Sequence, residues 1–157
     1  MSSPDSSGGH ADFINSSYDS DKHGHGDTAM TDVELLKPLR YRSIFISDTH
    51  LGFSGARADF LLDFLESVEC DTLYLVGDII DIWEMRRRRL RWPDSHNAVV
   101  QNILKRARNG TRVIYIPGNH DEMFRDYAGM SIEGVSIELR AIHECADGRR
   151  LLVLHGD

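Results

Sequence analysis

The pattern of hydrophobic and polar positions along this 157-residue chain changes near residue 39. Residues 1–38 are rich in Ser, Gly, Asp and His and show no hydrophobic period, which predicts a disordered tail. From residue 41 onward, short apolar runs alternate with stretches in which apolar residues recur at helical spacing. We therefore divide the chain into a tail, residues 1–38, and one folded unit, residues 39–157.

The apolar runs predict strands. Runs of four or five residues rich in β-branched and aromatic types predict buried strands at about 43–47, 72–76 and 111–116. Two further strands, at 135–142 and 149–154, are predicted to be joined by a turn at Asp147-Gly148.

The stretches with helical spacing predict helices. One covers residues 57–69, and a second runs from Ser95, a predicted N-cap, to Asn109-Gly110. A short third helix is predicted after Asp121. The order of elements predicts an α/β fold with parallel early strands and an antiparallel last pair, and therefore a mixed sheet.

Charge is distributed unevenly. The formal net charge is -7, but residues 1–34 hold seven acids and one base, so the folded unit is close to neutral. Trp83 and Trp92 are predicted core or loop anchors, and they flank a run of arginines: Arg86, Arg87, Arg88, Arg89 and Arg91. This run fits the capture of a phosphate or an anionic membrane surface, but most charge runs are solvated helical faces, and that interpretation is favoured here. Nucleic acid is disfavoured because the unit lacks net positive charge and interleaved aromatic residues.

Each of four apolar runs ends in residues that bind hard metal ions. These endings are Asp48-Thr49-His50, Gly77-Asp78, Gly118-Asn119-His120-Asp121 and His155-Gly156-Asp157. Any one of them alone is typical of a turn. In open α/β sheets, however, ligands bind beyond the carboxyl ends of the strands. We therefore predict that one crevice gathers five metal-binding side chains, those of Asp48, His50, Asp78, Asn119 and His155.

The donor set predicts the kind of metal site. Carboxylate, amide and imidazole donors without thiolate suit Mn²⁺, Mg²⁺, Fe²⁺ or Zn²⁺. Five ligands exceed the needs of one tetrahedral ion, so we predict two divalent ions with Asp78 as the carboxylate that bridges them. Such sites clamp the attacking and leaving oxygens in phosphoryl transfer.

The four motifs, in this order, resemble those of the calcineurin-like metallophosphoesterases. The strings at residues 47–52 and 77–83 are most similar to the subgroup that includes UDP-2,3-diacylglucosamine pyrophosphohydrolase, which cleaves a pyrophosphate in lipid A biosynthesis at the bacterial inner membrane. At position 120 the chain has His, as broader members of the family do, where that subgroup typically has Arg. The resemblance implies a mixed β-sheet sandwich flanked by helices, and two ions with Mn²⁺ preferred over Fe²⁺, Zn²⁺ or Mg²⁺.

The resemblance also implies roles for individual residues. Asp48, His50 and Asp78 would bind one ion, and Asp78, Asn119 and His155 would bind the other. His120 would stabilise the transition state or protonate the leaving oxygen. Asp81 would support a ligand histidine or act as a simple helix cap. The family's site ends in a Gly-His-x-His motif that this chain does not contain, so we interpret the chain as the N-terminal part of a longer domain, truncated at its C-terminus.

Two function hypotheses follow. The first is a metal-dependent hydrolase of a phosphodiester or pyrophosphate bond, acting on UDP-2,3-diacylglucosamine, a related nucleotide-lipid diphosphate or another phosphate-containing substrate, with phosphomonoesters as a further alternative. The second is a non-catalytic fragment or interaction module that keeps the fold. The absence of a secretory signal pattern, together with only two cysteines, predicts a cytoplasmic protein. The resemblance adds a peripheral contact with the inner membrane.

Overall fold

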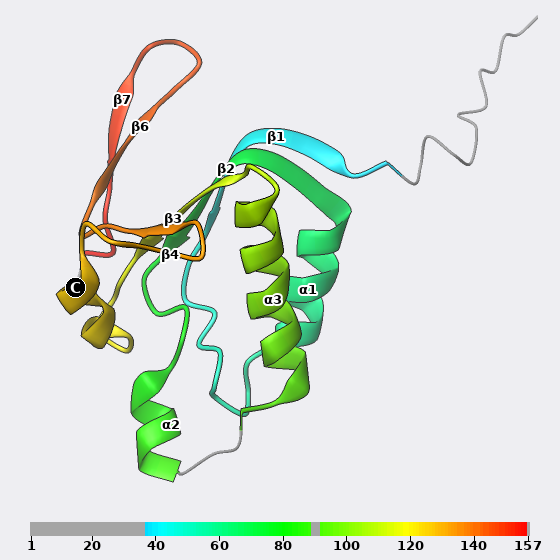
Figure 1. Cartoon of the computed structure of the whole chain (residues 1–157), viewed down its shortest axis with the longest axis vertical. Helices are drawn as coiled ribbons and strands as arrows, with labels where there is room; N and C mark the ends of the chain where they lie inside the picture. The colour runs from blue at the N-terminus through cyan, green and yellow to red at the C-terminus, as the bar shows by residue number, and fades with distance from the viewer. Residues whose placement is uncertain (1–36, 89–91, 157) are drawn as a thin grey trace, which may run out of the picture.

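The computed structural model describes residues 37–88 and 92–156 (Figure 1). Five strands form its main sheet in the order β1-β2-β3-β5-β4: β1 (Leu39–Ile46), β2 (Val68–Val76), β3 (Arg112–Ile116), β5 (Val135–Ile137) and β4 (Ser131–Ile132). The first four of these pair in parallel, and β4 is antiparallel to β5. The mixed α/β fold predicted from the sequence is therefore confirmed.

Helices cover one face of this sheet. Figure 1 shows α1 (Ala58–Ser67) and α3 (Asp94–Arg108) side by side against it. Leu65 of α1 and Val99 of α3 are fully buried in the same cluster as Leu73 of β2 and Val113 of β3. The apolar period of each helix thus marks the stripe that packs on the strands.

The opposite face of the sheet carries a second, thinner layer. The hairpin of β6 (Ala141–Glu144) and β7 (Arg150–Val153) is a separate antiparallel sheet. Its Ala141 and Val153 pack against a small cluster formed by Tyr74, Ile114 and Ile116. Because successive strand residues point to opposite faces, β2 and β3 supply both layers, which explains the apolar runs at 73–76 and 113–116.

Several boundaries differ from those predicted. The strand predicted at 135–142 is two strands, β5 and β6, in different sheets. The N–H of Glu138 still donates to the Tyr115 carbonyl of β3 at 2.9 Å, and pairing with β3 ends after this residue. The helix predicted after Asp121 is a 3₁₀ segment, η1 (Glu122–Tyr127). The first residue of α3 is Asp94, and its N-cap is Pro93, not Ser95. The two-residue strand β4 was not predicted.

The arginine run lies partly on α2 (Ile82–Arg88), which carries Arg86 and Arg87 and agrees with the helical interpretation. Arg89, Arg91 and the predicted tail up to residue 36 fall outside the described residues. Among the helices that the structure describes, none has the length and apolar character required to span a membrane.

Candidate metal centre

The predicted metal-binding residues lie in loops that follow the strands. Hydrogen bonds between backbone groups hold the first three of these loops together: Asp48 N–H donates to Gly77 C=O at 3.1 Å, His50 N–H to Asp78 C=O at 2.9 Å, and Gly77 N–H to Ile116 C=O at 2.7 Å. The parallel order of β1, β2 and β3 puts all three carboxyl ends at one edge of the sheet. The loops after β1, β2 and β3 therefore lie together at this edge.

Two groups of side chains in this region could each hold a metal ion. One comprises Asp48, Asp78 and His155, and the other His50, Asp78 and His120, with all ligand atoms of a group within 4.8 Å of one another. Asp78 belongs to both groups and is only 5% exposed. A carboxylate placed in this way is suited to bridge two ions.

The spacing of the donor atoms fits metal coordination better than hydrogen bonding. Nε2 of His50 and Nε2 of His155 each lie 3.9 Å from Oδ2 of Asp78, and Nε2 of His155 lies 4.0 Å from Oδ1 of Asp48. These separations exceed hydrogen-bond length. Two ligand atoms that are each about 2.1 Å from one ion lie at most about 4.2 Å apart, so the gaps can contain an ion.

The grouping differs from the sets that the resemblance implied. His155 lies beside Asp48 as well as Asp78, and His120 lies beside His50. Asn119 is half-buried in the same loop, between Gly118 and His120. The assignment of five metal ligands therefore stays a prediction, now with a defined geometry.

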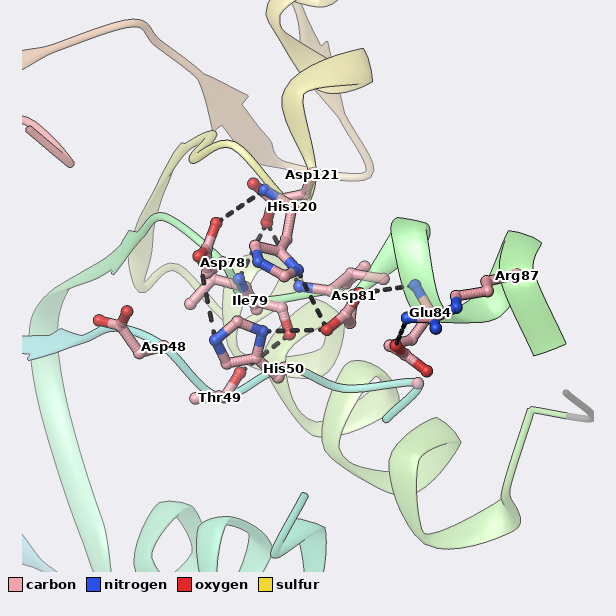
Figure 2. A network of polar contacts seen from close by, with 12 residues as sticks. Asp48, Thr49, His50, Asp78, Ile79, Asp81, Glu84, Arg87, His120 and Asp121 are labelled. Atoms are coloured by element: carbon pink, nitrogen blue, oxygen red, sulfur yellow. Dashed lines mark hydrogen bonds and ion pairs between the residues drawn. The ribbon is translucent and has the colours of Figure 1, made fainter. Parts of the chain in front are cut away.

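Asp81 connects two of the histidines. Its Oδ2 lies 3.2 Å from Nδ1 of His50 and 3.1 Å from Nδ1 of His120, and its Oδ1 accepts a hydrogen bond from Glu84 N–H at 2.8 Å (Figure 2). Burial alone would raise the pKa of Asp81, but the Glu84 N–H and the two histidines outweigh it, so the pKa is lowered. Both interpretations of Asp81 therefore hold: it caps α2 and it fixes the orientation of His50 and His120.

The charge of Asp81 also acts on His120. Burial alone would lower the pKa of His120, but the hydrogen bond and the charge of Asp81 prevail and raise it. With Nδ1 facing Asp81, Nε2 is the ring atom available to a substrate or an ion. A histidine of this kind keeps its proton to higher pH than a free imidazole.

Asp121 has a structural role that the sequence analysis did not assign. It is completely buried, and its Oδ2 accepts hydrogen bonds from Ile79 N–H at 2.9 Å, Ile80 N–H at 3.3 Å and the Tyr115 hydroxyl. Its Oδ1 accepts from Gly118 N–H at 2.6 Å. Asp121 thus joins the loop after β2 to the loop after β3. Burial, followed by the Asp121 charge, raises the pKa of Tyr115.

Two glycines make room for His155. A Cβ atom on Gly77, whose φ is +67°, would lie 2.0 Å from Cδ2 of His155. A Cβ on Gly118 would lie 2.3 Å from Oδ1 of Asp78 and 2.8 Å from Cε1 of His155. The glycine in each of these motifs is therefore needed for the close approach of the imidazole to the strand ends.

The chain is similar to several known proteins. The family model described as calcineurin-like phosphoesterase matches residues 41–157. The UDP-2,3-diacylglucosamine hydrolase of Psychromonas ingrahamii is 33% identical over 127 residues, covering 74% of this chain and 47% of that protein, so the chain spans about half the length of this relative. The crystal structure of the Pseudomonas putida nuclease MPE aligns with a TM-score of 0.37 and 18% identity, over 61% of this chain and 46% of that one.

Proposed function

Because this chain belongs to the calcineurin-like phosphoesterase family, we propose that it hydrolyses a phosphodiester or pyrophosphate bond with the help of two divalent metal ions. The observation that carries the proposal is Asp78, a buried carboxylate shared by two groups of donors that each include a histidine. Carboxylate, amide and imidazole donors suit Mn²⁺, Fe²⁺, Zn²⁺ or Mg²⁺ alike, and the family resemblance favours Mn²⁺ among them.

The residues of the chain would divide the work as follows. Two bound ions would neutralise the charge on the phosphate group and favour attack on phosphorus. Asp48, His50, Asp78, Asn119 and His155 would hold the ions. His120, whose pKa is raised by Asp81, would keep a proton and offer it from Nε2 to the leaving oxygen. Asp81 would keep both imidazoles in the orientation that these roles need.

The substrate class is a further part of the proposal. The relative that is 33% identical is named for UDP-2,3-diacylglucosamine, which supports a nucleotide-lipid diphosphate as substrate. A lipid-bearing substrate would bring the protein to the inner membrane surface as a peripheral, cytoplasmic contact.

The alternative, a non-catalytic interaction module, has its own support. On the face of the sheet opposite the helices, Phe45, Leu152 and Leu154 are 47%, 55% and 45% exposed. Apolar surface of this kind is typical of contacts with other polypeptide. The metal content separates the two functions: about two ions per chain supports the hydrolase, and none supports the module.

Asp78→Asn tests the hydrolase directly, with Asp71→Asn as the matched control because Asp71 is exposed and, within the described part of the chain, forms an ion pair with exposed Arg40 alone. Hydrolysis of bis-p-nitrophenyl phosphate with Mn²⁺ should fall to the uncatalysed rate in Asp78→Asn and stay unchanged in the control. Calorimetric titration with Mn²⁺ should show lost binding in Asp78→Asn, while the melting temperature measured without metal should be unchanged. Unchanged turnover in Asp78→Asn would remove Asp78 from the bridging role.

A further inference from the structure

A pocket lies next to the candidate metal centre, between α2 and η1. Its volume is about 380 Å³, and its lining includes Trp83, Arg86, His120, Glu122, Arg125 and Asp126. Small-molecule sites commonly have volumes of roughly 300–1,000 Å³. His120 is therefore shared: it belongs to the metal centre on one side and forms a wall of this pocket on the other.

The wall beside His120 is aromatic. The ring centroids of Trp83 and His120 are 4.7 Å apart, with an angle of 32° between the ring planes. Trp83 lies on α2 and is 46% exposed, so it is neither the core anchor nor the loop anchor that the sequence predicted. An exposed indole in the lining of a pocket offers a surface on which a planar group can stack.

Arg86 supplies a cation that makes only a weak hydrogen bond within the described residues. Its guanidinium contacts the Met123 sulfur at 4.0 Å, and within the described residues it pairs with no carboxylate. A thioether is a weak acceptor, so most of the N–H donors of Arg86 remain available to an anion. By contrast, the neighbouring Arg87 pairs with Glu84 at 3.6 Å and does not line the pocket.

The remaining lining residues add a third kind of group. Glu122 and Asp126 are exposed carboxylates in the same wall as Arg125. A simple phosphate would be repelled by these two acids. A ligand that carries both phosphate and hydroxyl groups can pair with the acids and the arginines of the lining alike. Its sugar hydroxyls donate to the carboxylates, and its phosphate oxygens accept from arginine.

We propose that this pocket binds the nucleoside phosphate part of the substrate. The base stacks on Trp83, the phosphate accepts hydrogen bonds from Arg86 and Arg125, and the ribose hydroxyls donate to Glu122 or Asp126. The proposal rests on the proposed function, because it takes the pocket as the extension of a phosphate-binding centre. It predicts that the chain selects substrates carrying a nucleotide over simple phosphodiesters.

The experiment uses Trp83 as the reporter. In a Trp92→Phe background Trp83 is the only tryptophan, and its emission is followed on titration with UMP in the presence of EDTA. Saturable quenching by UMP is expected. Uridine and inorganic phosphate should each bind at least about tenfold more weakly than UMP. Since no metal and no turnover are involved, the result is independent of the hydrolase proposal.

Two variants locate the binding. Arg86→Gln should weaken UMP binding about tenfold or more, the loss expected for a charge-assisted hydrogen bond, whereas Arg87→Gln should bind UMP as the background protein does. No saturable quenching by UMP, or equal binding in Arg86→Gln, would overturn the pocket proposal. Hydrolysis without UMP binding would refute only the pocket, and UMP binding in a protein that neither binds Mn²⁺ nor hydrolyses phosphodiesters would refute only the hydrolase.

Discussion

Asp121→Asn is the sharpest test of how the fold supports the candidate metal centre. In the native protein Oδ2 of Asp121 accepts three hydrogen bonds and Oδ1 accepts one, from Gly118 N–H at 2.6 Å. Asparagine has the same shape but only one acceptor oxygen. That oxygen would take the place of Oδ2, because three donors meet there, and the amide NH₂ would then face Gly118 N–H.

The cost follows from these contacts. Asp121→Asn removes the charge from the hydrogen bonds that remain, and it sets two donors against each other at the Gly118 position. A hydrogen bond to a charged group contributes about 1.5–3 kcal/mol, and a buried unsatisfied donor costs about 1–3 kcal/mol. We expect a net loss of about 3 kcal/mol in the free energy of unfolding. For a folded unit of this size that loss lowers the melting temperature by about 10 °C.

Thermal unfolding followed by circular dichroism measures this loss. Asp63→Asn is the control, because Asp63 is an exposed residue on α1, away from the metal centre. Tyr115→Phe removes one of the four donors and should cost about 1 kcal/mol, with strong coupling to Asp121→Asn in the double variant. A melting temperature for Asp121→Asn within about 1 °C of the control would refute the view that this carboxylate holds the two loops together.

Two further predictions concern close approach and pH. Gly77→Ala and Gly110→Ala both place a Cβ at positive φ, but only at Gly77 does that atom meet the His155 ring. Calorimetry should therefore show Mn²⁺ binding that is about 10- to 100-fold weaker in Gly77→Ala and unchanged in Gly110→Ala. Equal Mn²⁺ affinities of the two variants would show that the His155 ring has room to move. Buried His96 accepts a hydrogen bond from Gly52 N–H at 2.8 Å, and burial lowers its pKa below the ordinary 6.5. The unfolded state therefore binds more protons, so stability is fully present above pH 6.5 and falls as the pH drops below it. Urea unfolding of His96→Asn, which keeps an acceptor without a titrating proton, should show a shallower loss there, and an unchanged slope would exclude His96 as its source.

The sequence contained enough information to predict the arrangement of the strand ends. The carboxyl halves of β2 and β3 are the apolar runs 73–76 and 113–116, and Gly77-Asp78 follows the first directly while Pro117-Gly118-Asn119 follows the second. The parallel order then requires the residues that follow to meet at one edge. For this reason the positions of Asp48, His50 and Asp78 could be inferred without the structure.

The support behind those residues could not be inferred in the same way. Asp121 accepts hydrogen bonds from the backbone of Ile79 and Ile80, about forty positions earlier in the chain, and backbone donors leave no mark on the amino-acid pattern. The pocket beside Trp83 likewise depends on the packing of α2 against η1. The break between β5 and β6 was missed because apolar alternation continues while the chain changes sheets.

Backbone strain at the centre indicates why this support is needed. Of the non-glycine residues in the described ranges, Asp48, His50, Asp78 and Glu133 have positive φ, and the first three are candidate ligands. Each such conformation costs about 1–2 kcal/mol. The cost is offset by the bonds between neighbouring loops and by Asp121, which fix the turns that aim these side chains at one another. An arrangement that concentrates strain and negative charge at one point is stabilised further when a cation binds there, so folding and metal binding should reinforce each other in this protein.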